Sequence, residues 1–169
     1  MAMTHKIMTI EEVCIRADAW RSRGDKIVLT TGCYDLLHGS HIAFLRDAKA
    51  LGDRLIVSLG NDATVRNLKG DSRPVYNQFH RAEMLSALEC VDAVYISEEF
   101  GELDHWKIMQ IVRPEMYAVG EGSCAMTAKR QLADEVDAQV VVLPPHPAYH
   151  AGAVVSTTQT VGAILRSAA

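Results

Sequence analysis

Residues 26 to 41 read KIVLTTGCYDLLHGSH, and this stretch decides the fold. Its first six residues are mainly apolar or β-branched, which is typical of a short strand buried in a sheet. Gly32 then interrupts the strand, and a helical spacing of apolar residues begins near Ser40. A strand, a glycine-containing loop and a helix in this order predict one unit of a parallel α/β sheet.

The same alternation continues through the rest of the chain. Further strands are expected at residues 54–59, 93–96, 116–119 and 139–143. Helices are expected near residues 40–51, 62–68, 78–88, 103–112, 124–136 and 156–167. Strands that are apolar throughout and lie between helices predict a parallel sheet covered on both faces. The fold class is therefore α/β, with a Rossmann-like, doubly wound, five-stranded parallel sheet in a three-layer α/β/α arrangement.

The N-terminal segment is expected to be helical. Thr9 and Glu12 have the spacing of a capping box, and Gly24 is a suitable end for the helix that follows. We expect residues 1–24 to form a helical extension and residues 26–167 to form the core. The length of 169 residues predicts one domain, spanning residues 1–169.

Composition excludes several classes of protein. Hydrophobic residues make up 49% and charged residues 22%, as in an ordinary globular domain. The net charge is −4, from 17 basic and 21 acidic residues, so no nucleic-acid partner is expected. No apolar run approaches the roughly 20 residues of a membrane span, so no membrane partner is expected. Four cysteines without a C-x-x-C pair favour a cytoplasmic location.

Two histidines, His38 and His41, follow the first core strand where a helix begins. Doubly wound folds bind ligands beyond the carboxyl ends of their strands, and helix N-termini favour phosphate. A phosphate site is therefore the favoured hypothesis. A zinc site without an apparent third ligand, ordinary surface or capping histidines, and a flavodoxin-like redox domain remain alternatives. His80 and His105 are expected to be surface histidines.

Residues 64 to 81 are locally basic. This segment contains Arg66, Lys69, Arg73 and Arg81 against Asp71 alone, a local charge of +3 in a chain of net charge −4. Such a segment can bind an anion, or it can be a solvated loop of mixed charge.

The stretch around His38 resembles the signature of the cytidylyltransferase-like nucleotidyltransferases, which carry an H-x-G-H motif. The resemblance continues through residues 52–57, 61–63 and 68–75 and through the run Ser156-Thr157-Thr158. Residues 68 to 75, LKGDSRPV, are most similar to the heptose-1-phosphate adenylyltransferase domain of bacterial heptose biosynthesis. Glycerol-3-phosphate cytidylyltransferase is a more distant relative with the same landmarks.

Two positions depart from the family pattern. Ser40 stands where the motif has its glycine, and it could cap the helix or donate to a phosphate. Glu121 follows Gly120 where relatives usually carry an aspartate. Both departures favour the alternative that the chain is a non-catalytic nucleotide-binding module.

The resemblance implies an enzyme, a nucleotidyltransferase that releases pyrophosphate. It would transfer a nucleoside monophosphate from a nucleoside triphosphate, with ATP favoured, to a phosphorylated sugar such as a heptose 1-phosphate. The alternative is a cytidylyltransferase acting on glycerol 3-phosphate or another small polyol or alcohol phosphate. Mg²⁺ is expected with the triphosphate, held mainly by its phosphates rather than by protein ligands. A homo-oligomer, namely a dimer, is implied as well.

The resemblance also implies the site residues. The catalytic set is His38, His41 and Lys69, whose ammonium would bridge the phosphates of both substrates. The nucleotide-binding set is Thr31, Gly32, Cys33, Tyr34, Asp35, Ser40, Arg81, Gly120, Glu121, Ser156, Thr157 and Thr158.

Overall fold

The five strands expected from the sequence are present in the computed structural model, which describes residues 6–101, 105–146 and 156–167. The strands are β1 (Ile7–Met8), β2 (Ile27–Gly32), β3 (Arg54–Leu59), β4 (Ala93–Ile96), β5 (Met116–Gly120) and β6 (Gln139–Leu143). The helices are α1 (Ile10–Arg21), α2 (Gly39–Lys49), α3 (Asp62–Lys69), α4 (Gln78–Ser86), α5 (Trp106–Val112), α6 (Met126–Asp134) and α7 (Thr157–Ser167).

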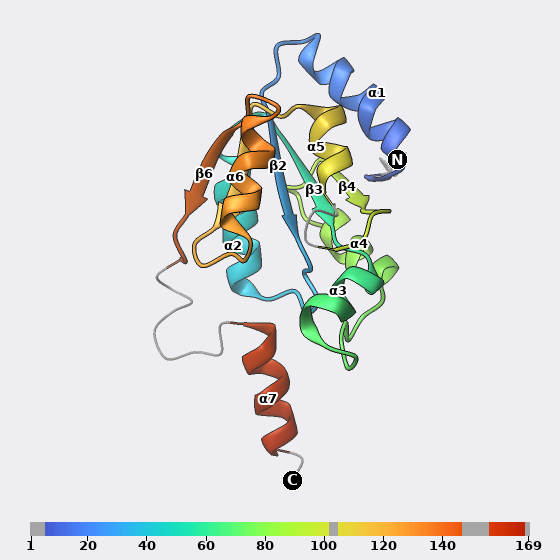
Figure 1. Ribbon diagram of the computed structural model, residues 1–169, viewed down its shortest axis with the longest axis vertical. Helices are drawn as coiled ribbons and strands as arrows, with labels where there is room; N and C mark the ends of the chain where they lie inside the picture. Colours follow the sequence, from blue (N-terminus) through green and yellow to red (C-terminus); the bar gives the residue numbers. More distant parts are fainter. Residues whose placement is uncertain (1–5, 102–104, 147–155, 168–169) are drawn as a thin grey trace.

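All strand pairs are parallel, and the strand order is β1-β4-β3-β2-β5-β6. One face of the sheet packs on α2 and α4, through Leu45 and Leu85 among others. The opposite face packs on α1, α5 and α6, through Trp20 and Ile108 among others (Figure 1). The doubly wound, three-layer α/β/α fold is thereby confirmed.

The sheet has one strand more than the five expected. The additional strand, β1, contains only Ile7 and Met8, and it pairs in parallel with Val94 and Tyr95 of β4. Two residues are too few to produce a recognisable apolar run, so tertiary pairing defines this strand. The segment before α1 thus forms the edge strand of the sheet in addition to preceding the helix. The capping box of Thr9 and Glu12 is present as expected.

The connections of the two halves of the sheet run over opposite faces. The chain crosses from β2 through β3 to β4 over one face, and from β4 through β5 to β6 over the other. The direction of winding therefore reverses between β2 and β5, which are hydrogen-bonded neighbours. In doubly wound sheets, ligands bind beyond the carboxyl ends of the strands at this switch point.

Helix α7 is set apart from the three layers. None of its described residues is buried, and Figure 1 shows it extending away from the sheet. Its N-terminal end lies beside the loop that follows β2, because the Thr157 hydroxyl donates to the Leu36 carbonyl over 3.3 Å. Among the described residues, no helix combines the length and the apolar character needed to cross a membrane.

Candidate active site

In the loop after β2, the backbone of Gly32 lies close to the aromatic ring of Tyr34. Thr31 and Gly32 end the strand, and Tyr34 turns back with a positive φ of 43°. A Cβ on Gly32 would lie 2.8 Å from the Tyr34 ring, so this position requires glycine. The Thr31 hydroxyl hydrogen-bonds the Tyr117 hydroxyl of neighbouring β5 over 2.8 Å. Tyr34 is buried, which raises the pKa of its phenol. These contacts fix the path of the loop toward α2.

The two histidines of the motif stack on each other at the start of α2. His38 is the N-cap residue, and its ring lies 3.7 Å from the His41 ring, centroid to centroid, at an interplanar angle of 22°. The edge of Tyr34 contacts His41 at a centroid distance of 5.2 Å. The Nδ1 atoms of both histidines are buried, and neither has a hydrogen-bond partner among the described residues. Two imidazoles stacked at a helix N-terminus, where backbone amides lack helical partners, are suited to a ligand with several oxygen atoms.

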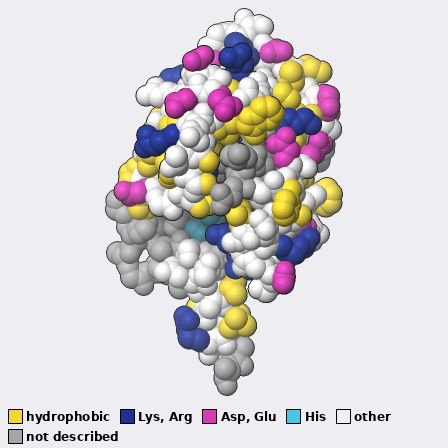
Figure 2. Space-filling model, viewed as in Figure 1, with side chains coloured by type: hydrophobic (Ala, Val, Ile, Leu, Met, Phe, Trp, Pro, Cys, Tyr) yellow, Lys and Arg dark blue, Asp and Glu magenta, His cyan; other side chains and the backbone are white. Residues whose placement is uncertain are grey.

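Both imidazoles favour their neutral forms. Burial, and secondarily the charge that His38 can carry, lower the pKa of His41 to about 4. Burial also lowers the pKa of His38. A phosphate that entered this place would reverse the effect, because an anion beside an imidazole favours its charged form. Figure 2 shows histidine surface in a recess of the molecule, next to Lys or Arg side chains.

Acid pH is expected to destabilise the folded chain through His41. The unfolded side chain binds a proton below its ordinary pKa of 6.5, whereas the folded one resists protonation down to about 4. Protonation of this imidazole therefore favours the unfolded state. The free energy of unfolding is unaffected above pH 6.5 and falls by at most about 3 kcal/mol as the pH falls toward 4. His41→Gln should lose this part of the acid sensitivity, as measured by urea unfolding at pH 7 and pH 4.5. The exposed-residue control His80→Gln should follow the wild type, and parallel pH profiles of wild type and His41→Gln would contradict the assignment.

Ser40 does not cap α2, contrary to one role expected for it. The N-cap position is His38, and Ser40 is the second residue of the helix. The last helix, α7, has its own cap, because the Ser156 hydroxyl accepts a hydrogen bond from the Gln159 amide over 3.2 Å. Thr157 bonds to the histidine loop through Leu36, and Thr158 is exposed in the same first turn. The structure thus brings the run from Ser156 to Thr158 beside the loop of His38 and His41.

A buried ion pair ties the basic segment to the same loop. Asp35 accepts from the Arg73 guanidinium through one oxygen and from the Val75 amide, over 2.6 Å, through the other. Both charged side chains are buried. Lys69 is the last residue of α3 and is exposed, four positions before Arg73. Asp35 therefore holds the segment that follows Lys69 rather than presenting a vacant carboxylate to a ligand.

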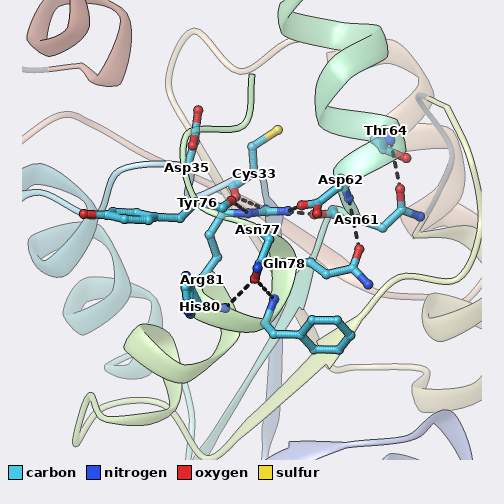
Figure 3. Close-up of polar contacts among 12 residues, drawn as sticks. Cys33, Asp35, Asn61, Asp62, Thr64, Tyr76, Asn77, Gln78, His80 and Arg81 are labelled. Atoms are coloured by element: carbon cyan, nitrogen blue, oxygen red, sulfur yellow. Dashed lines mark hydrogen bonds and ion pairs between the residues drawn. The ribbon is translucent and has the colours of Figure 1, made fainter. Parts of the chain in front are cut away.

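The side chain of Arg81, a residue expected in the nucleotide-binding set, is enclosed by the protein instead. Its side chain is completely buried, and its guanidinium donates to three carbonyls and one carboxylate (Figure 3). The acceptors are Tyr76 O at 3.0 Å, Cys33 O at 2.5 Å, Gly60 O at 2.9 Å and Asp62 Oδ1 at 2.7 Å. The residue therefore fastens the loops after β2, β3 and α3 to one another. A side chain so enclosed and so fully bonded is a structural anchor.

Gly120 and Glu121 lie on the other side of β2, at the carboxyl end of β5. Gly120 ends the strand, and a Cβ there would meet only ordinary contact distances, the nearest being 3.8 Å to Phe44. The Glu121 amide donates to the Leu143 carbonyl over 2.9 Å, and its side chain is exposed. These residues border the switch point, although the structure records no contact between them and the histidines in the part of the chain it describes.

Sequence reasoning missed two polar contacts close to this end of the sheet. The ion pair of Asp35 and Arg73 joins residues 38 positions apart. His105, expected at the surface, is buried and hydrogen-bonds the buried Ser58 hydroxyl over 2.8 Å, which fixes the start of α5 to β3. Neither partner could be chosen from local sequence, since no short-range pattern links them.

Comparisons with known proteins agree with this geometry. The model of the family Cytidylyltransferase-like matches residues 29–162. The Bifunctional protein HldE of Methylobacillus flagellatus is 40% identical over 119 residues, which are 70% of this chain and 24% of that protein. The protein of the same name from Wolinella succinogenes is 44% identical over 115 residues, 68% of this chain and 24% of its own. The chain thus spans about a quarter of the length of the curated relatives it matches.

Two solved structures are similar in fold. The lipopolysaccharide core biosynthesis protein from Thermoplasma volcanium superposes with a TM-score of 0.61 at 27% identity, covering 73% of this chain and 98% of the other. Pantoate-beta-alanine ligase from Francisella tularensis superposes with a TM-score of 0.62 at 18% identity, covering 95% and 78%, and this likeness concerns the fold alone. Since the family model matches most of its length, from β2 to the middle of α7, the chain belongs to the cytidylyltransferase-like family.

Proposed function

We propose that this chain is a nucleotidyltransferase that joins a nucleoside monophosphate to a phosphorylated sugar, with ATP as donor and a heptose 1-phosphate as acceptor. The observation that carries the proposal is the stacked pair of His38 and His41, each with an orphaned buried ring nitrogen, at the N-terminus of α2. Family membership and the similarity to HldE proteins support the reaction class and the sugar.

The reaction needs positioning and charge stabilisation more than covalent work by the protein. An oxygen of the acceptor phosphate would attack the α-phosphorus of the triphosphate and form a new P–O bond. The bond from that phosphorus to the bridging oxygen of the β-phosphate would break, and pyrophosphate would leave with the electron pair. Negative charge grows on the oxygens around the α- and β-phosphorus atoms during this step, so preorganised N–H donors accelerate it.

The residues around the switch point can supply these donors. His38 and His41 would donate from their rings, and the first amides of α2 would add backbone donors. The hydroxyls and amides at the start of α7, from Ser156 to Thr158, would hold the outer phosphates from the opposite side. Lys69, exposed at the end of α3, would bring a mobile positive charge to the phosphates. Thr31, Gly32, Cys33 and Tyr34 would shape the wall beside the nucleoside, with Gly120 and Glu121 bordering it.

Magnesium would accompany the triphosphate, bound chiefly by phosphate oxygens and water. The donor set supports this arrangement, because both oxygens of Asp35 already accept hydrogen bonds from Arg73 and Val75. Within the described ranges, no group of three or more His, Cys, Asp or Glu side chains is placed to hold a metal ion. When bound, the cation would neutralise charge on the leaving pyrophosphate.

The proposal extends to organisation and location. Residues 26–167 would form the catalytic core of one domain spanning residues 1–169, with residues 1–24 as an extension that also completes the sheet edge. A cytoplasmic location is supported by the four cysteines, all of which are free thiols. A homo-dimer is included because the resemblance implies one, and the exposed Ile164 and Leu165 of α7 offer apolar surface for it.

Pyrophosphate release tests the proposal directly. The chain is mixed with Mg²⁺, with each of ATP, CTP, GTP and UTP, and with heptose 1-phosphate or glycerol 3-phosphate. We expect release with ATP and heptose 1-phosphate, and the same triphosphate should raise the melting temperature by binding linkage. Release with CTP and glycerol 3-phosphate would replace the proposal by the cytidylyltransferase alternative. Triphosphate binding without turnover for any pair would favour a non-catalytic module.

A further inference from the structure

A cavity of about 1250 Å³ opens at the edge of the sheet, and neither His38 nor His41 lines it. It lies at the carboxyl ends of β4 and β3, between the N-terminal turns of α3 and α4 and the start of α1. Its volume exceeds that of one sugar ring and is of the order seen for small-molecule sites, about 300–1,000 Å³. None of the residues assigned above to the catalytic or nucleotide-binding sets lines it.

The two reactants would lie on opposite sides of β2. The nucleotide is expected at the switch point between β2 and β5, where such folds bind their nucleotides. The acceptor phosphate must reach the same histidines, so its remaining part has to extend toward β3 and β4. Neighbouring strands lie about 4.8 Å apart, which puts the end of β4 about 10 Å from the end of β2. A sugar phosphate is long enough to span this interval.

A single guanidinium joins the cavity wall to the histidine loop. Arg81 donates to the Cys33 carbonyl, one residue beyond β2, and also to the carboxylate of Asp62, which lines the cavity (Figure 3). The same group bonds Gly60, which directly precedes the two lining residues Asn61 and Asp62. The cavity and the histidine loop are therefore adjacent and held in a fixed relation.

The lining has the mixed character that a hydroxylated ring requires. Phe79 and Phe100 line the cavity and are 67% and 66% exposed, so both aromatic side chains are accessible to a ligand. The C–H face of a pyranose is apolar and packs on such rings, while its hydroxyls project from the ring edge. Carboxylates that can accept hydrogen bonds from hydroxyl groups border the same space, including Glu98, whose side chain is 61% exposed and lies 3.4 Å from the Lys107 ammonium. Arg66 is an exposed donor there.

We infer that this cavity is the subsite for the hydroxyl-bearing ring of the acceptor, a polyhydroxylated sugar whose phosphate points to His38 and His41. The inference rests on the nucleotidyl transfer proposed above and assigns the acceptor to one wall of that site. Phe79 packs on the ring, and Arg66 with the neighbouring carboxylates bonds its hydroxyls.

Binding of each substrate alone, measured by titration calorimetry, tests the subsite without requiring turnover. The probes are heptose 1-phosphate and Mg²⁺-ATP, added separately to the full chain. Phe79→Ala and Arg66→Gln should each weaken heptose 1-phosphate binding about tenfold and leave ATP binding unchanged. The matched controls lie outside the cavity: Ile15→Ala is an exposed apolar change on α1, and Arg130→Gln removes an exposed arginine of α6. Both controls should bind the two probes as the wild type does.

The possible results separate this inference from the proposed reaction. Weakened sugar-phosphate binding in the two cavity variants supports the subsite even if no pyrophosphate is ever released. Unchanged sugar-phosphate binding in both variants, or a loss of ATP binding instead, overturns it. Wild-type chain that binds no heptose 1-phosphate overturns it as well, whereas pyrophosphate release with ATP and another sugar phosphate would leave nucleotidyl transfer to a phosphorylated sugar standing. All four altered side chains are exposed, so unchanged melting temperatures will show that the fold is retained.

Discussion

His41→Ala is expected to lower turnover by about 10²- to 10³-fold, the loss typical for removal of one preorganised donor to a developing charge. His41 is held by the stacked His38 ring on one side and by the edge of Tyr34 on the other, so its ring has little freedom to reorient. Its buried Nδ1 has no hydrogen-bond partner among the described residues, and the Leu36 backbone is the hydrogen-bonding group that acts on the pKa of the ring. The change therefore removes a donor to substrate together with two ring contacts, and the melting temperature reports on the loss of those contacts.

The measurement is initial-rate pyrophosphate release at saturating ATP and heptose 1-phosphate. His80→Ala is the control, because His80 is exposed on α4 and lies outside the proposed site. It should keep the wild-type rate. Folding of the His41→Ala variant is checked by its melting temperature at pH 7, where the wild-type imidazole is neutral. A wild-type rate in His41→Ala would remove this histidine from the catalytic set.

The fold could be predicted from sequence wherever an element had its own local pattern. β3, with five of its six residues buried, and the capping box of Thr9 and Glu12 both carry signals that a single segment contains in full. β1 carries no such signal, since two residues acquire strand geometry only by pairing with β4, 87 positions later. Local sequence pattern therefore predicts whether a segment is a helix or a strand, whereas strands without such a pattern are determined by long-range pairing.

The residues of the candidate site also differ in how well local sequence predicts them. His38, His41 and the residues from Ser156 to Thr158 could be identified because a motif, or a helix start, marks them in the sequence. The roles of Arg73 and Arg81 could not, since both look like members of one basic, solvated segment. Burial separates them: Arg73 pairs with Asp35 and Arg81 is enclosed by three loops, while Lys69 of the same segment remains exposed. Charge counting cannot distinguish an anchor from a ligand contact, because the difference lies in partners distant along the chain.

Arg81→Met is expected to destabilise the fold by about 3–5 kcal/mol, the cost typical of removing one partner from a buried ion pair. Methionine fills much of the volume of arginine, so the loss of stability measures mainly the hydrogen bonds and the ion pair of the guanidinium. The carbonyls of Cys33, Gly60 and Tyr76 would each lose a charged donor, and Asp62 would lose its counter-ion. Urea unfolding monitored by circular dichroism measures the change. Arg130→Met, which alters an exposed arginine of α6, should differ from wild type by no more than about 0.5 kcal/mol.

Two further variants decide between an anchor and a phosphate contact at Arg81. Arg81→Lys keeps the charge but cannot reach four acceptors from one ammonium, so it should recover only part of the stability. Asp62→Asn removes the counter-ion while leaving the arginine in place, and it keeps the test usable if Arg81→Met fails to fold. An anchor predicts a loss of stability in all three variants. A phosphate contact predicts wild-type stability with weakened ATP binding in Arg81→Met, and that pattern would refute the anchor. Because the guanidinium is completely buried and bonded to four acceptors, the stability loss is the expected outcome.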